Sequence, residues 1–217
     1  MEKDCHMPAG RAYLFDMDGT IVDNCGYHVK SWLAFANRHG KVLTETQILD
    51  WMGAANRVYC ERLFGHPISD EENARYTSEK ETIYREIYRP HLRAPEGLRE
   101  LLASARRGGI RCAVVTGGSK PNVDFILDGL ALRGEFSLLV DDSCYTRSKP
   151  DPECFLVAAE KFGVDPADCT VFEDAVAGVR SAKAAGMRVI AITHTNPRET
   201  LLAAGADRVI DAFTELL

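Results

Sequence analysis

The sequence predicts an α/β protein in which a doubly wound parallel sheet carries an inserted all-α domain. The first observation is that short β-branched or apolar runs alternate with helical patterns along most of the chain. This alternation is typical of a parallel sheet with helices on both faces. The second is that residues from about 25 to 91 show helical patterns and no convincing strand. We therefore expect a sheet domain that is interrupted early by a helical insertion.

Six runs are predicted as strands because they are short, β-branched or apolar, and lie between helical patterns. The helices between them carry start and stop signals. Asp151-Pro152 and Asn196-Pro197 each pair a capping side chain with a proline at the first helical position, and Gly163, Gly186 and Gly205 stand where helices should end. The predicted strands are residues 12–15, 112–116, 137–140, 170–172, 189–192 and 208–210.

The insertion contains four amphipathic helical patterns. Thr44-x-x-Gln47 and Ser69-x-x-Glu72 have the spacing of capping boxes at helix starts. Pro90, Pro95 and Gly97 break the helical pattern before the sheet domain resumes. The predicted organisation is a catalytic core made of residues 1–23 and 93–217, with a helical cap of residues 24–92.

Size and composition are those of an ordinary globular protein of 217 residues, with 46% hydrophobic and 27% charged residues. The seven cysteines contain no C-x-x-C pair, which argues against a zinc site or a disulfide framework. A formal net charge of −6 argues against nucleic-acid or anionic-membrane partners. With no signal-like start and no run long enough to span a bilayer, we expect a cytoplasmic protein, as a monomer or weak homodimer.

The stretch YLFDMDGTIVDN, residues 13–24, places two aspartates directly after the first predicted strand. Side chains alternate along a strand, so Asp16 and Asp18 should emerge on the same side where the strand ends. Two neighbouring carboxylates repel each other, and the pair persists only if a cation, a shared proton or hydrogen-bond donors compensate. The competing interpretation is turn chemistry, because aspartate favours turns.

Polar groups also follow the next three strands. In an open parallel sheet, ligands bind beyond the carboxyl ends of the strands. Acids, a hydroxyl, glycine amides and one cation therefore meet at one edge, and such a set suits a phosphate together with Mg²⁺, which prefers oxygen ligands such as Asp16 and Asp174. These residues are Thr116, Gly117, Gly118 and Ser119 after the second strand, Lys149 after the third, and Glu173 and Asp174 after the fourth.

Four short motifs carry a family resemblance: DMDGT, VVTGG, SKPDP and FEDAVAG. With these four motifs in this order, the sequence resembles the haloacid dehalogenase superfamily. Within that superfamily it resembles the β-phosphoglucomutase-like group, which has a helical cap on a Rossmann-like core. The resemblance implies that Asp16 is the nucleophile that takes the phosphoryl group and that Asp18 is the general acid and base. It assigns phosphate binding and charge stabilisation to Thr116 and Lys149.

The resemblance also implies the metal ligands and several substrate contacts. The Mg²⁺ ligands would be the Asp16 carboxylate, the Asp18 backbone carbonyl and Asp174, with Glu173 acting through water. Gly117, Gly118, Ser119 and Lys120 would help to bind the phosphate. The cap would contribute His28, Trp32, Arg57 and Lys80. The alternatives are a helix-start histidine over a packed Trp32, and a surface helix arginine at position 57.

An aspartate at position 18 favours phosphate-ester chemistry, because phosphonate-cleaving relatives have a small residue there and true dehalogenases do without this acid and without metal. The expected function is a Mg²⁺-dependent phosphatase of small phosphorylated metabolites, most of all sugar phosphates, acting through an aspartyl-phosphate. The first alternative is a β-phosphoglucomutase-type hexose-phosphate mutase. The second is a non-catalytic phospho-acceptor regulatory domain, which also gathers acids, a threonine and a lysine at strand ends.

Overall fold

The computed structural model describes residues 11–51 and 54–217. The chain divides into two compact units. The first is discontinuous in sequence: it comprises the chain up to Asp23 together with Arg93–Leu217. The second comprises Asn24–Leu92, which is inserted between these two segments. We call them the sheet unit and the helical unit.

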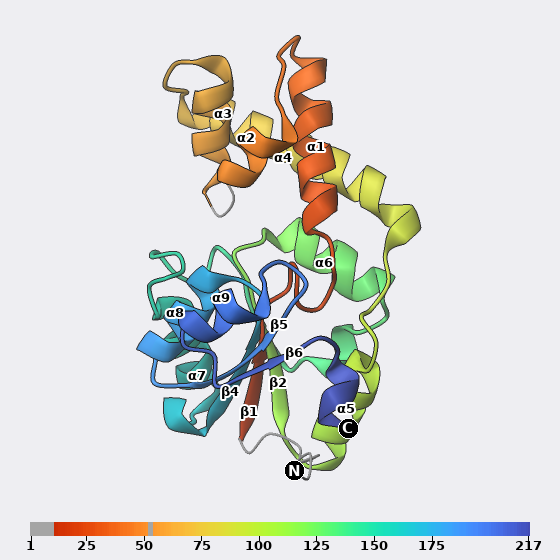
Figure 1. Cartoon of the computed structure of the whole chain (residues 1–217), viewed down its shortest axis with the longest axis vertical. Helices are drawn as coiled ribbons and strands as arrows, with labels where there is room; N and C mark the ends of the chain where they lie inside the picture. The colour runs from red at the N-terminus through yellow and green to blue at the C-terminus, as the bar shows by residue number, and fades with distance from the viewer. Residues whose placement is uncertain (1–10, 52–53) are drawn as a thin grey trace. The chain divides into compact units, whose positions relative to one another are not determined.

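The sheet unit is built on six strands in the order β3-β2-β1-β4-β5-β6 (Figure 1), and every neighbouring pair is parallel. All carboxyl ends therefore point to the same edge, and the strand order reverses between β1 and β4, where ligands bind in such sheets. The prediction of a doubly wound parallel sheet is confirmed. The strands are β1 (Ala12–Phe15), β2 (Arg111–Val115), β3 (Leu138–Val140), β4 (Cys169–Glu173), β5 (Arg188–Ile192) and β6 (Arg208–Ile210).

Helices cover both faces of the sheet, with α7, α8 and α9 on one side and α5 on the other (Figure 1). The first face packs small apolar residues such as Ala158 and Ala182 against the strands. The opposite face is aromatic, and Phe15 stacks on Phe172 with ring centroids 4.3 Å apart. The helices are α5 (Leu98–Arg107), α6 (Lys120–Gly129), α7 (Glu153–Phe162), α8 (Val176–Ala184) and α9 (Arg198–Ala203), with 3₁₀ turns η2 (Arg133–Glu135), η3 (Pro166–Asp168) and η4 (Phe213–Leu216).

The predicted helix signals are mostly confirmed, with two corrections. Both capping boxes form, and Gly163 ends α7 in the left-handed conformation. Pro152 and Pro197, however, are the N-cap residues of α7 and α9 and not the first helical residues. The Asp151 carboxylate still accepts the Glu153 N–H at 3.0 Å, whereas α9 has no side-chain cap. The prediction that Asn196 caps α9 is therefore wrong, and its amide has another partner, described below.

The helical unit consists of α1 (Cys25–Arg38), α2 (Glu45–Asp50), α3 (Asn56–Phe64), α4 (Asp70–Tyr88) and the 3₁₀ turn η1 (Arg89–His91). Its interior is largely aromatic, and Trp32 stacks on Tyr59 at a centroid distance of 4.5 Å. The described part of this unit contains no strand, as the sequence predicts. Among the described residues of the whole chain, no helix has the length and hydropathy needed to cross a membrane.

Candidate active site

Asp16 lies directly beyond the central strand β1, and its backbone N–H donates to the Phe172 carbonyl of β4 at 3.0 Å. This bond extends the β1–β4 pairing by one residue and fixes where the carboxylate begins. The chain then turns, with the Met17 carbonyl accepting the N–H of Ile21 at 2.9 Å. Asp16 is 8% exposed, whereas Asp18 is half-buried. The two aspartates thus share one strand end but differ in their access to solvent.

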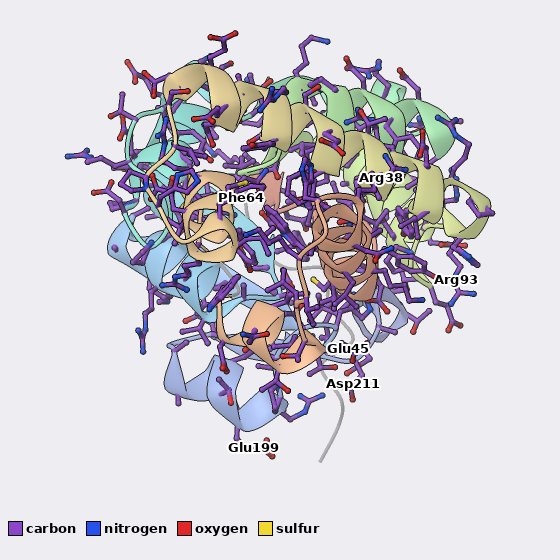
Figure 2. All side chains as sticks on the ribbon, turned by 90° about the horizontal axis from the view of Figure 1, so that it is seen from above. Arg38, Glu45, Phe64, Arg93, Glu199 and Asp211 are labelled. Atoms are coloured by element: carbon purple, nitrogen blue, oxygen red, sulfur yellow. The ribbon has the colours of Figure 1, made fainter. Side chains whose placement is uncertain are left out.

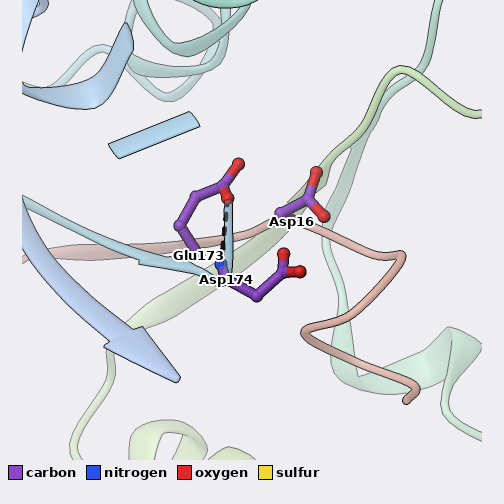
Figure 3. A group of neighbouring side chains, drawn as sticks. All are labelled: Asp16, Glu173 and Asp174. Atoms are coloured by element: carbon purple, nitrogen blue, oxygen red, sulfur yellow. Dashed lines mark hydrogen bonds between the residues drawn. The ribbon is translucent and has the colours of Figure 1, made fainter. Parts of the chain in front are cut away.

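Three carboxylates lie close together at the carboxyl ends of the neighbouring strands β1 and β4. Asp16, Glu173 and Asp174 are all buried, each offers an oxygen within 4.8 Å of the others, and Figure 3 shows the side chains converging. Burial raises the pKa of Asp16 well above its ordinary value, against the opposing influence of Lys149. Burial and the nearby Glu173 raise the pKa of Asp174 to about 8. Burial and the neighbouring acids therefore both disfavour the charged forms of Asp16 and Asp174.

Lys149 provides charge compensation for these carboxylates. Its Nζ donates to Asp16 Oδ1 and to Glu173 Oε1, both at 2.6 Å, and its side chain is only 14% exposed. Burial by itself would lower the pKa of Lys149, but the two carboxylates outweigh burial and raise the pKa well above its usual value. The ammonium group therefore stays charged beside Asp16.

Glu173 is held by contacts that leave little freedom to its carboxylate. Oε2 accepts the backbone N–H groups of Asp174 at 2.9 Å and of Ala175 at 3.0 Å. A Cβ built on Gly178 of α8 would lie 1.7 Å from Glu173 Oε1, so any side chain at 178 would displace the carboxylate. Since both oxygens already accept hydrogen bonds, Glu173 is best suited to orient Lys149.

Asp174 is packed against the turn that follows β1. Its Oδ1 accepts the Thr20 hydroxyl at 3.2 Å, and the Thr195 side chain also donates to the carboxylate. Gly19 has φ +82°, and a Cβ there would lie 2.0 Å from Asp174 Oδ2. Glycine at 19 is therefore required twice, by its left-handed backbone and by the close approach of the acid.

The turn after β2 supplies a hydroxyl and glycine amides beside Asp18. Thr116 is 1% exposed, and its Oγ1 accepts the Gly118 N–H at 2.9 Å. A Cβ on Gly118 would lie 2.9 Å from Met17 Cε and 3.4 Å from Asp18 Oδ2. The Tyr145 hydroxyl donates to the Thr116 carbonyl at 3.0 Å. The turn after β2 is thus packed against Met17 and Asp18, which follow β1, and is also held by the Tyr145 hydroxyl.

The chain is similar to known proteins over most of its length. Residues 11–186 match the family described as haloacid dehalogenase-like hydrolase. The chain belongs to the haloacid dehalogenase-like hydrolase family. This confirms the resemblance carried by the four sequence motifs and the expectation that the chain is an enzyme of the hydrolase class.

Relatives within this family include both phosphatases and a mutase. The chain is 31% identical to hexitol phosphatase A of Escherichia coli over 95% of this chain and 93% of that protein. It is 29% identical to β-phosphoglucomutase of Bacillus subtilis over 95% and 91%. A haloacid dehalogenase hydrolase structure of family IA, variant 3, from Entamoeba histolytica has a TM-score of 0.89 at 28% identity, covering 95% of both chains. These similarities place the chain in the β-phosphoglucomutase-like group of the family.

Two residues predicted to bind phosphate lie at the start of α6. Ser119 is the N-cap residue of this helix and makes no side-chain capping bond. Lys120 is exposed and pairs with Asp124 one helical turn away, at 2.5 Å. Their contacts with phosphate, like that of Gly117, stay predictions for this haloacid dehalogenase-like hydrolase.

Three of the four predicted cap residues gather inside the helical unit. Lys80 Nζ is 2.8 Å from His28 Nδ1 and 2.9 Å from Glu81 Oε1, and it lies 5.3 Å from the centre of the Trp32 ring system. Lys80 is 2% exposed, so its ammonium group is part of the interior of this unit. The predicted substrate contacts of these three residues stay predictions.

Arg57 lies on α3 and is bound within its own unit. It donates to the Ile68 carbonyl at 2.7 Å, forms an ion pair with Asp70, and has Glu61 at 3.8 Å. Arg57 ends the stretch MGAANR, residues 52–57, whose glycine, Gly53, lies outside the described residues. These contacts hold α3 to the start of α4. Both interpretations of Arg57, a substrate contact and a surface helix arginine, stay predictions.

Four side chains that contact the site were not among the candidates predicted from the sequence: Thr20, Tyr145, Thr195 and Asn196. Thr20 could have been included, because it is the last residue of the DMDGT motif. Tyr145, Thr195 and Asn196 have no such signal, since their partners are 20 or more positions away and no local pattern marks the contact. The sequence pattern predicts a helix cap at Asn196, but its Nδ2 donates to the Asp174 carbonyl at 3.0 Å.

Proposed function

We propose that this chain is a Mg²⁺-dependent phosphatase of small phosphorylated metabolites, above all sugar phosphates, and that it acts through an aspartyl-phosphate on Asp16. The observation that carries the proposal is the Lys149 bridge between Asp16 and Glu173, with both distances 2.6 Å. It joins the ends of β1 and β4 to the loop that follows β3, around one buried carboxylate. A buried carboxylate paired with a buried lysine is not expected if Asp16 only forms a surface turn, which was the competing interpretation.

The chain's own residues divide the chemistry between them. The Asp16 carboxylate attacks the phosphorus and the ester bond to the leaving oxygen breaks, while Asp18 gives that oxygen a proton. Asp18 then takes a proton from the water that attacks the phosphorus, and Asp16 is released with inorganic phosphate. The half-buried position of Asp18 suits this exchange of protons with solvent. Thr116 and Lys149 hold the phosphate oxygens and offset their charge.

The residues fit a magnesium ion. Asp16 and Asp174 offer hard oxygen ligands in a buried cluster whose members lie within 4.8 Å of one another, and Mg²⁺ typically takes one or two carboxylates together with substrate phosphate. Burial first, and the neighbouring carboxylates after it, raise the pKa of both aspartates, and a bound cation would favour their charged forms. Asp16, Asp174 and the Asp18 backbone carbonyl would hold the ion, which stabilises charge on the phosphate when bound.

Removal of divalent cations is expected to abolish hydrolysis. Protein stripped with a chelator and then desalted should release phosphate from a panel of hexose, pentose and hexitol phosphates at least ~100-fold more slowly than with Mg²⁺, because charge stabilisation at the phosphoryl group is lost. Phosphate release over the panel, with and without Mg²⁺, is the measurement. Hydrolysis that is independent of the metal, or no turnover of any sugar phosphate, would contradict the proposal.

Hydrolysis and mutase activity share this site and are separated by their products. A mutase needs a second anion site for the bisphosphate intermediate, and Arg57, the candidate for that site, is engaged by Asp70 and Ile68. This favours the phosphatase. With β-glucose 1-phosphate as substrate, free phosphate supports the phosphatase and glucose 6-phosphate supports the mutase.

A further inference from the structure

The loop between β5 and α9 (residues 193–197) approaches the acid cluster although it belongs to none of the four motifs. Three consecutive side chains make the contacts. The Thr195 side chain donates to the Asp174 carboxylate, and Asn196 Nδ2 donates to the Asp174 carbonyl at 3.0 Å. His194 Nδ1 lies 2.9 Å from the Gly19 carbonyl; since a carbonyl only accepts, Nδ1 carries the proton. The loop thus binds both segments that supply the predicted metal ligands.

Asp174 is held between this loop and the turn after β1. A Cβ built on Gly19 would lie 2.0 Å from Asp174 Oδ2 and 2.8 Å from Thr195 Oγ1, so the backbone of the turn touches the acid and the hydroxyl together. Thr20, the next residue of the same turn, donates to Asp174 Oδ1 at 3.2 Å. Asp174 is only 2% exposed. Its carboxylate is therefore fixed by the donors and the backbone around it, and its main chain is fixed by Asn196.

These polar side chains are not needed to build the loop itself. The loop continues the sheet through its backbone, with the Thr193 N–H donating to the Ile210 carbonyl at 3.1 Å. The helix that follows begins without a side-chain cap. Asn196 lies one residue before the N-cap Pro197, and its amide donates to the Asp174 carbonyl and not to the start of the helix. The side chains at 194–196 therefore serve the acid cluster and the turn beside it.

We propose that Thr195 and Asn196 are positioning residues that make the site select Mg²⁺ over Ca²⁺. The inference rests on the proposed function, because it requires Asp174 to be a metal ligand. Mg²⁺ demands short, near-octahedral coordination, whereas Ca²⁺ accepts longer distances and flexible ligands. A carboxylate that cannot shift is matched to the smaller ion. Removal of a residue that hydrogen-bonds to a metal ligand commonly weakens metal binding ~10- to ~100-fold.

Thr195→Val and Asn196→Ala test the proposal without relying on turnover. Calorimetric titration of the metal-stripped proteins is expected to give a Mg²⁺ Kd raised ~10-fold or more, with a Ca²⁺ Kd changed less than about threefold because Ca²⁺ tolerates the loosened ligand. Thr195→Ser keeps the hydroxyl and should restore Mg²⁺ affinity. Thermal unfolding of the metal-free variants checks that they fold.

Thr193→Val is the matched control on the same loop. Its hydroxyl donates at 2.7 Å to the exposed Asp211, which is labelled in Figure 2. Loss of this hydroxyl should therefore leave both Kd values unchanged. Equal weakening of Mg²⁺ and Ca²⁺ in the Thr195 and Asn196 variants, or no change in either, would overturn the inference. Wild-type protein that binds no Mg²⁺ would overturn the proposed metal site as well, so the two failures are distinguishable.

Discussion

Replacing Asp16 by asparagine is expected to reduce phosphate release at least ~10⁴-fold, because an amide cannot take up the phosphoryl group and removal of a covalent nucleophile has effects of this size. The fold should persist. Lys149 keeps its bond to Glu173 at 2.6 Å, and a neutral side chain avoids the cost of burying charge that raises the pKa of Asp16. Steady-state phosphate release with the best sugar phosphate of the panel is the measurement, and circular dichroism checks the fold.

Asp50→Asn is the control for this variant, since Asp50 is an exposed aspartate at the end of α2. This variant should release phosphate at the wild-type rate. An Asp16→Asn protein that keeps the wild-type rate with several sugar phosphates would refute the assignment of the nucleophile.

Lys149→Met is expected to lower both activity and stability. Activity should fall ~10³-fold because the cation beside the developing charge is lost. The free energy of unfolding of the metal-free protein should fall by about 3 kcal/mol, since Asp16 and Glu173 are left buried without their shared partner. Phosphate release and guanidinium chloride unfolding in chelator measure the two effects. Lys161→Met, which replaces an exposed lysine near the end of α7, is the control.

Adding Glu173→Gln to Lys149→Met separates the two roles. The introduced amide keeps an oxygen that can accept the N–H groups of Asp174 and Ala175, but the substitution removes one buried charge, so part of the lost stability should return. Activity should not return, because the cation is still missing. A double variant as unstable as Lys149→Met would mean that charge compensation is not what Lys149 contributes to folding.

Most of the sheet and its acid-bearing edge were predictable from the sequence, because both follow from local patterns. Strand β1 is a run of four buried residues, and its alternation sends Tyr13 and Phe15 to one face and Leu14 to the other. The acids follow directly after β1 and β4 in the sequence, so a parallel sheet brings them together. Capping boxes such as Thr44-x-x-Gln47 were likewise predictable because both partners lie within four residues.

The contacts that fix the site were not predictable, because they join residues that are far apart in sequence. Asn196 before Pro197 has the same local pattern whether it caps a helix or donates to Asp174, 22 positions away. Gly178 has the pattern of an ordinary small residue of a packed helix, and only the folded structure places Glu173 in the space its side chain would fill. The bond from Arg57 to the Ile68 carbonyl is likewise visible only in the folded structure.

The most direct test of the account is to trap the phosphorylated enzyme. Wild-type protein is mixed with sugar phosphate and Mg²⁺, quenched, and reduced with borohydride, which converts an aspartyl-phosphate to homoserine; peptide mass spectrometry then locates the change. The account predicts homoserine at position 16, dependent on substrate and on Mg²⁺. Rapid turnover with the residue at 16 unmodified, or with the label on another side chain, would contradict it.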